Sequence, residues 1–275
     1  MESMTRIIGS GLCVVATLAF YASAWAQQSS GDAATDLAKQ TQNPVADLIS
    51  VPLQNNFNFN TGPFDRLQYQ GLLQPVVPLG LTDDWNVIVR PIIPFVDQPV
   101  GASSSTFGLG DTVVQTYLSP KKPGYVTWGV GPIGQFPTRT DPVLGAGMWG
   151  AGVGGVALIT PGPWVIGSLL NHVWSIGTPA ADQQHFSITT IQPFINYNFG
   201  HGTALGFVSQ MTRDGTRPEG QQWTVPLGGT VSQVVVLGHQ PVQFNLGAFY
   251  NVAHPDGAAD WQLRFQVTLL FPKGK

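Results

Sequence analysis

The residues from 261 to 271 alternate between large apolar and polar side chains. The odd positions are Trp261, Leu263, Phe265, Val267, Leu269 and Phe271, and the even positions begin Gln262, Arg264, Gln266 and Thr268. Because successive side chains of a strand point to opposite faces, this segment has one apolar and one polar face. A strand of about ten residues with this pattern is the unit of a transmembrane β-barrel. A sandwich strand with one solvent-exposed face shows the same alternation, so a single strand leaves both folds open.

Comparable segments recur along the chain. We predict twelve strands, at 53–60, 67–79, 85–95, 107–118, 125–136, 147–159, 164–176, 185–199, 203–212, 222–236, 241–252 and 261–271. Their connections alternate in length: short ones lie at 80–84, 119–124, 160–163, 200–202 and 237–240, and longer ones at 96–106, 137–146, 177–184, 213–221 and 253–260. An even strand number with short periplasmic turns and longer external loops is typical of bacterial barrels. The predicted fold class is therefore all-β, a transmembrane antiparallel up-and-down β-barrel of about twelve strands with a short N-terminal helix.

Aromatic residues cluster near the predicted strand ends. They are Trp85, Tyr117, Tyr125, Trp149, Trp164, Trp174, Tyr197, Trp223, Tyr250 and Trp261. Amphipathic rings at these positions are expected to form the two girdles at the membrane–water interfaces of a barrel. The alternative is that they are core aromatics of a sandwich.

The first residues have the features of a secretory signal. Arg6 supplies a positive charge, 7–20 is an apolar stretch, and an A-x-A site ends at Ala26. We therefore predict a signal peptide at 1–26, export to the periplasm and insertion into the bacterial outer membrane. The single cysteine, Cys13, lies in this signal, which excludes a disulfide framework or a thiolate metal site from the mature chain.

A lead-in segment at 27–52 is expected to contain a short helix before the barrel at 53–275. Asn43 can act as an N-cap, Pro44 suits the first helical position, and the apolar residues that follow share one helical face. Such a helix at 43–49 could plug the lumen, lie at the periplasmic rim or form an ordinary surface segment.

Composition narrows the class of protein. Only 10% of the 275 residues are charged, against the roughly 25% usual in soluble domains, yet mean hydropathy is only +0.09. Beyond the N-terminus no run of about 18 apolar residues exists, which excludes helical membrane spans. A net charge of -3 argues against a nucleic-acid partner, which needs a basic footprint.

The predicted polar faces are rich in amides. The candidate lumen-lining residues are Arg90, Asp111, Gln115, Gln192, Asn196, Gln243, Arg264 and Gln266, with Gln68, Gln70, Gln74 and Asn245 on the same faces. Such a lumen would pass small neutral or mildly polar solutes without strong ion selectivity. Alternatively, these groups pack against one another and a plug, and leave no pore. Arg90 and Asp111 lie on neighbouring predicted strands and could pair, either to tune selectivity or as a structural contact.

Few residues point to catalysis. The five histidines show no metal-ligand spacing, and no G-x-S-x-G motif is present, so we predict no catalytic residue, metal or cofactor. One exception is His185 followed two residues later by Ser187, because outer-membrane phospholipases are twelve-stranded barrels with a His and a Ser spaced in this way. The Asn-Gly that follows in that family is replaced here by Ile188 and Thr189. A lipid-acting enzyme and a structural or adhesive barrel are the alternatives to transport.

Several stretches resemble one protein family. They are TQNPVADLISVPLQNN at 41–56, WGVGP at 128–132 with PT at 137–138, QPFINYN at 192–198, VPLG at 225–228, WQLRF at 261–265 and LFPK at 270–273. Over roughly 41–273 the chain is similar to the proteobacterial outer-membrane β-barrel transporter family often labelled "neuromedin U", which is itself similar to the outer-membrane proteins of meta-pathway phenol degradation. The resemblance implies an outer-membrane channel or transporter for small, hydrophobic or aromatic solutes. The expected partners are outer-membrane lipid and a small-molecule solute, with no nucleic acid and the oligomeric state left open. The family has no catalytic or binding residues to carry over.

Overall fold

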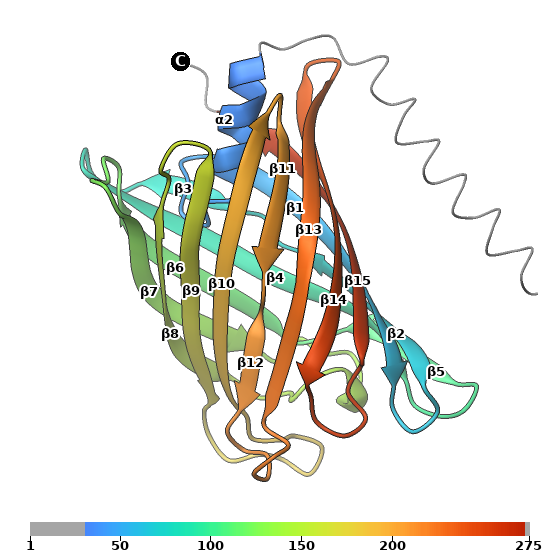
Figure 1. The fold of residues 1–275 in the computed structure, drawn as a ribbon. Coiled ribbons are helices and arrows are strands. Elements are labelled where there is room, and N and C mark those ends of the chain that lie inside the picture. Colours follow the sequence, from blue (N-terminus) through green and yellow to red (C-terminus); the bar gives the residue numbers. More distant parts are fainter. Residues whose placement is uncertain (1–30, 273–275) are drawn as a thin grey trace, which may run out of the picture.

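The computed structural model describes residues 31–272 as a closed antiparallel β-barrel (Figure 1). Its strands are β1 (Ile49–Thr61), β2 (Arg66–Leu73), β3 (Val77–Gly80), β4 (Trp85–Pro99), β5 (Ser105–Leu109), β6 (Thr112–Pro120), β7 (Thr127–Phe136), β8 (Gly150–Ile159), β9 (Trp164–Ser175), β10 (Ser187–Gly200), β11 (Thr203–Val208), β12 (Met211–Asp214), β13 (Trp223–Leu237), β14 (Gln240–Ala253) and β15 (Trp261–Phe271). Three strands of the barrel are interrupted and therefore carry two labels each. These strands are β2 with β3, β5 with β6, and β11 with β12. The result is the twelve-stranded barrel that the alternation predicted.

Each strand pairs with its neighbour in sequence, and the last strand returns to the first. The β1–β15 pairing runs in register from Ile49 opposite Phe271 to Phe59 opposite Trp261. Because every strand has two hydrogen-bonded neighbours, the sheet has no free edge, which is the condition for a sheet to span a bilayer. The prediction of an up-and-down transmembrane barrel is therefore confirmed.

The two ends of the barrel differ. One end, called here the helix end, carries the connections at 81–84, 121–126, 160–163, 201–202 and 238–239. The other, called the loop end, carries those at 62–65, 100–104, 137–149, 176–186, 215–222 and 254–260. The loop-end connections at 137–149, 176–186, 215–222 and 254–260 are long as predicted, but those at 62–65 and 100–104 are as short as the turns at the helix end. Figure 1 shows the helix at the end opposite the long loops.

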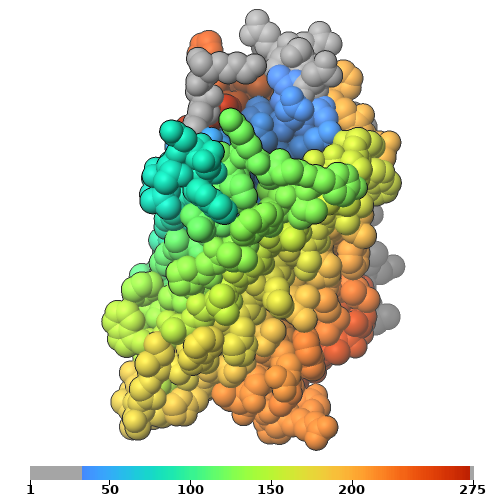
Figure 2. Space-filling view, turned by 90° about the vertical axis from the view of Figure 1, so that its left-hand side faces the viewer, coloured from blue at the N-terminus to red at the C-terminus, as the bar shows by residue number. Residues whose placement is uncertain are grey.

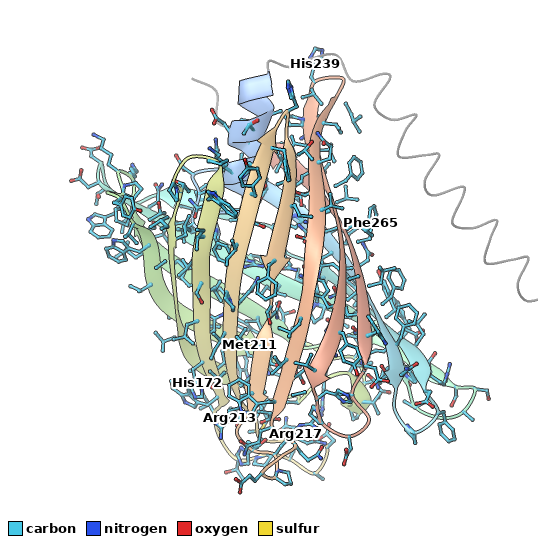
Figure 3. All side chains as sticks on the ribbon, in the orientation of Figure 1. His172, Met211, Arg213, Arg217, His239 and Phe265 are labelled. Carbon is cyan, nitrogen blue, oxygen red and sulfur yellow. The ribbon has the colours of Figure 1, made fainter. Side chains whose placement is uncertain are left out.

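The inner and outer faces of β15 follow the predicted parity. Trp261, Leu263 and Phe265 are exposed on the outside, whereas Arg264 and Gln266 line the interior. Figure 3 shows Phe265 on the outer surface. Among residues 31–272 no helix is long and apolar enough to cross a bilayer.

Most of the aromatic residues expected at the membrane interfaces are exposed on the outside of the barrel. The exposed members are Tyr125, Trp149, Trp164, Trp174, Trp223, Tyr250 and Trp261. Tyr117 differs, because its ring is fully buried inside the barrel and its hydroxyl donates a hydrogen bond to Asn171 Oδ1 at 3.1 Å. The expectation that Tyr117 lies in an interfacial girdle is therefore wrong.

The N-terminal helix exists, but not where the sequence pattern placed it. Helix α2 spans Gly31–Thr41, and the predicted helical segment at 43–49 is instead a turn that leads into β1. The Asn43 side chain accepts a hydrogen bond from Val45 N two residues ahead, which stabilises a local turn in place of a helical cap. Ile49 already pairs with β15 and so cannot be helical. The predicted signal peptide at 1–26 lies outside the described residues.

Candidate functional site

The segment 31–48, called here the plug, occupies the helix end of the barrel. One face of α2 is apolar, and Ala38 and Leu48 are buried against Val234 of β13 and Leu270 of β15. Figure 2 shows the blue N-terminal segment seated within the rim of the strands. The plug is therefore packed into the barrel mouth and is not a surface segment.

The turn of the plug crosses to the opposite wall, where Val45 enters an apolar cluster. This cluster consists of Val45 with Ile88, Tyr117, Val156, Leu158, Val165, Leu169 and Phe194, from β4, β6, β8, β9 and β10. A Cβ atom on Gly129 would come within 2.9 Å of Val45 Cγ1, so the glycine allows the plug to approach the wall closely. The plug therefore makes an apolar contact with this wall of the barrel.

Hydrogen bonds hold the same plug to the wall at several points. Gln42 and Asn198 of β10 form a reciprocal amide pair, with N···O distances of 3.0 and 3.2 Å. Gln243 Nε2 of β14 donates to Thr41 Oγ1 at 2.7 Å, and Lys39 Nζ donates to a carbonyl oxygen in the 160–163 turn at 2.8 Å. The plug is thus tied to several strands by groups that would otherwise be solvated.

Below the plug lies a cavity of about 200 Å³, called here the inner cavity. Its lining includes six of the residues predicted from the sequence, namely Arg90, Gln192, Asn196, Gln243, Arg264 and Gln266. The plug residues from Gln40 to Pro44 also line it, at the helix end. The predicted polar face therefore surrounds a space and is not fully packed against itself.

A second cavity, of about 590 Å³, occupies the loop half of the barrel and is called here the outer cavity. Its wall comes from β1, β2, β4, β10, β12, β13, β14, β15 and the loops at 215–222 and 254–260. The two cavities share Gln54 and Arg264 in their linings, which places these side chains where the cavities meet. The two cavities therefore adjoin each other between the loop end and the plug, and the space that they occupy is called here the path.

One wall of this path carries two runs of hydrogen-bonded side-chain amides, called here together the amide ladder. Its members are Gln54, Asn56, Asn58, Gln68, Gln74, Gln98 and Gln262 from β1, β2, β4, β15 and the residues between β2 and β3. Consecutive members donate to one another, for example Gln54 Nε2 to Asn56 Oδ1 at 3.1 Å and Gln262 Nε2 to Asn58 Oδ1 at 2.9 Å. Arg264 joins the ladder by donating to Asn56 and Gln262. Because the donors and acceptors satisfy one another, the polar wall is held in one arrangement.

The two remaining predicted lumen residues lie elsewhere. Gln115 is buried opposite Arg90 in the β4–β6 register but does not line the inner cavity. Asp111 lies in the break between β5 and β6, where its carboxylate accepts hydrogen bonds from the backbone N–H of Arg139 and of Gly147. Arg90 and Asp111 make no ion pair among the described residues, so the predicted pair is wrong. The strand break at Gly110 and Asp111 turns the carboxylate to the loop end.

The connection at 137–149 is held by hydrogen bonds and an ion pair. It contains the short helix η1 (Pro142–Leu144), and Asp141 Oδ1 accepts a hydrogen bond from Val143 N. Arg139 donates to the carbonyl of Gly145 at 2.7 Å and pairs with Asp182 at 2.8 Å, which joins this loop to the 176–186 loop. Leu144 is buried near Gly108 and Gly110. Asp111 and Arg139 therefore serve the loop structure.

The residues of the enzyme alternative are not arranged for catalysis with each other. His185 lies in the exposed loop before β10, and its Nδ1 is 2.9 Å from Ser175 Oγ, not from Ser187. Ser175 Oγ also accepts from Phe186 N, so it supports the loop backbone. Within 31–272, no group of three or more His, Cys, Asp or Glu side chains is placed to hold a metal ion.

Sequence reasoning missed the amides of β1 and the residues of the plug. Gln54, Asn56 and Asn58 occupy alternate positions, but Asn55 between them is also polar and bonds Tyr69 on the outside, which hid the alternation. In the β1–β15 pairing they lie opposite Gln266, Arg264 and Gln262. A comparison of the polar positions of the first and last strands could therefore have revealed them. In the plug, Ala34, Leu37 and Ala38 have the spacing of one helical face. The signal was weak because two of these three residues are alanines.

Comparison with known proteins gives relatives in structure only. No family model and no curated protein matches the chain. An outer-membrane channel from Pseudomonas putida F1 has 16% identity and a TM-score of 0.61, over 82% of this chain and 94% of that one. The NanC porin has 9% identity and a TM-score of 0.52, over 81% of this chain and 100% of that one. At these identities the likeness shows that the chain shares their barrel fold.

Proposed function

We propose that this protein is an outer-membrane channel for small polar solutes, closed at its periplasmic end by its own N-terminal segment. The observation that carries the proposal is the pair of cavities that meet at Gln54 and Arg264 and end at the plug. With the helix end in the periplasm and the loop end outside, a solute would enter the outer cavity and stop at the inner one until the plug moves. The fold shared with channels and porins supports this role.

The amide lining favours polar solutes over the hydrophobic or aromatic solutes that the family resemblance implies. Amides such as Gln192 and Asn196 offer hydrogen bonds that a small polar solute can exchange for those of water. An apolar solute would remove water from these groups without replacing its hydrogen bonds, which is unfavourable. Val45 covers part of the apolar interior, whereas Leu169 and Phe194 of the apolar cluster also line the inner cavity.

Single-channel recording in a planar bilayer tests the proposal. The chain from Gln27 would be compared with a variant lacking 31–48, which removes the plug but keeps β1 from Ile49 onward. We expect rare or small current steps from the complete chain and larger, sustained steps from the variant. Heat-modifiable migration on gels would establish that both barrels are folded. A folded variant without any current would overturn the channel proposal.

Uptake by liposomes separates the two solute classes. Vesicles carrying the plug-less variant would be tested with a small sugar and with a phenol of similar size. For the polar path we expect the sugar to enter these vesicles faster than it enters empty vesicles. Phenol should enter both kinds of vesicle at the same rate. Accelerated entry of phenol alone would favour the hydrophobic solutes that the family resemblance implies.

A further inference from the structure

The inner cavity contains two arginines and no carboxylate among the described residues that line it. Arg90 projects from β4 and Arg264 from β15. The ion pairs found in residues 31–272 involve Arg139, Arg217 and His254, all in or next to the loops at the loop end. Buried charges are normally paired with an opposite charge, so two guanidinium groups without one require an explanation.

Arg90 has a hydrogen-bond donor without a partner. One of its terminal nitrogens donates to Gln74 Oε1, but its Nε–H has no hydrogen-bond partner although it is buried. Gln115, its register partner on β6, likewise has a buried Oε1 without a donor. Unsatisfied buried groups are rare in folded proteins and commonly mark a bound water, ion or ligand. Here an unfilled donor and an unfilled acceptor belong to paired positions of neighbouring strands.

Arg264 is fixed where the two cavities meet. Its Nε donates to Asn56 Oδ1 at 3.1 Å, one terminal nitrogen donates to Gln262 Oε1 at 3.0 Å, and its guanidinium carbon lies 4.7 Å from the centre of the Phe249 ring. All three partners are neutral, so the positive charge remains uncompensated by them. A fixed positive charge in the wall of a lumen raises the local concentration of anions.

From this geometry we propose that the inner cavity binds a small organic anion with a single carboxylate, held by Arg90 and admitted past Arg264. A guanidinium presents its N–H groups in a planar fork that matches the two oxygens of a carboxylate. The cavity of about 200 Å³ is smaller than ordinary small-molecule pockets, which begin near about 300 Å³, so the anion must be small. The site itself needs only the folded barrel, whereas the route of the anion rests on the proposed channel.

Calorimetric titration of the refolded full chain tests the site. Benzoate and acetate are the anionic probes, and benzamide is the uncharged probe with the shape of benzoate. We expect benzoate or acetate to bind and benzamide not to bind. Arg90→Gln should weaken binding by about tenfold to a hundredfold, the usual effect of losing a hydrogen bond to a charged group. Arg213→Gln, on β12 outside both cavity linings, should leave the affinity unchanged.

Three results would overturn the site. They are equal affinity for benzoate and benzamide, full affinity in the Arg90→Gln barrel, and absence of binding by both anions, which would mean that water alone fills the cavity. Figure 3 places Arg213 near the loop end, which makes it a suitable charge-matched control.

The reversal potential across a KCl gradient separates this inference from the channel proposal. In the plug-less variant we expect current carried mainly by chloride, and Arg264→Gln should move the reversal potential toward zero. Conduction without anion preference and without carboxylate binding would contradict the anion site but agree with the channel proposal. Carboxylate binding without conduction would contradict the channel proposal but agree with the anion site.

Discussion

The two walls of the lumen are both well packed, but by different interactions. The amide ladder on β1, β2, β4 and β15 is held by hydrogen bonds between side chains and borders the cavities. The apolar cluster on β4, β6, β8, β9 and β10 is held by close packing and surrounds Val45. A polar wall can face water at no cost in free energy, because water replaces its hydrogen bonds. An apolar wall is more stable when other apolar groups cover it. The path therefore follows the amide ladder, and the plug is anchored on the cluster.

The largest effect should come from placing a charge in the apolar cluster. In Val45→Asp the carboxylate would have to leave water for a site formed by apolar side chains, which should weaken plug docking by about 3 kcal/mol. We expect longer open times in bilayer recordings and faster protease cleavage within 31–48. Val45→Ala, which removes two methyl groups, should weaken docking by only about 2 kcal/mol. Unchanged cleavage in Val45→Asp would mean that the cluster does not anchor the plug.

Removing a charge from the amide ladder should have the next largest effect. Arg264→Ala leaves Gln262 Oε1 without its donor and should lower the free energy of unfolding by about 2 kcal/mol, measured by urea titration of the folded barrel. Were the side chain directed to lipid, the same change would stabilise the barrel by about 2 kcal/mol. Arg213→Ala provides a comparison outside the cavities, where it removes one hydrogen bond to Gln222 Oε1 and should lower the free energy of unfolding by about 1 kcal/mol.

A single methyl group at Gly129 should disturb the plug without disturbing the barrel. In Gly129→Ala the new Cβ would lie 2.9 Å from Val45 Cγ1, so the plug would have to shift at a cost of about 1–2 kcal/mol in docking. Gly155→Ala on β8 is the matched control, because the nearest atom to its new Cβ is 3.5 Å away. Protease cleavage within 31–48 should therefore rise only in Gly129→Ala, and equal rates in both variants would argue against the contact.

The smallest effect should follow from removing one hydroxyl inside the apolar cluster. Tyr117→Phe keeps the ring but leaves Asn171 Oδ1 without the donor at 3.1 Å, at a cost of about 1 kcal/mol in unfolding free energy. Tyr250→Phe, with an exposed ring on the outside of β14, should be nearly neutral. A larger loss for Tyr250 than for Tyr117 would contradict the assignment of Tyr117 to the interior.

The fold was predictable because its determinants are local and periodic. Alternation in segments such as 261–271 defines which face meets lipid, and the alternating lengths of the connections define the two ends. The helix was misplaced because Asn43 and Pro44 favour a turn as much as a helix start, and only pairing of Ile49 with Phe271 decides between them.

The candidate site was predictable only in part. Parity placed Arg264 and Gln192 on the inner face, but parity carries no information about which side chains touch across the lumen. From the sequence, Arg90 and Asp111 could pair because their predicted strands are neighbours, yet Asp111 lies in the break between β5 and β6 and binds the 137–149 loop. Contacts of the plug join residues more than 150 positions apart, such as Gln42 and Asn198, and follow only from the closed barrel.

The direct connection of the plug to β1 at Ile49 makes it an intramolecular ligand of its own lumen. A covalently attached segment is present at an effective concentration in the millimolar range, whatever the amount of protein in the membrane. Contacts too weak to hold a free peptide would therefore keep the lumen closed, and a released plug would return quickly. Opening would then be brief and repeated, and its frequency would depend on how tightly the mouth holds the plug, not on the supply of a separate stopper.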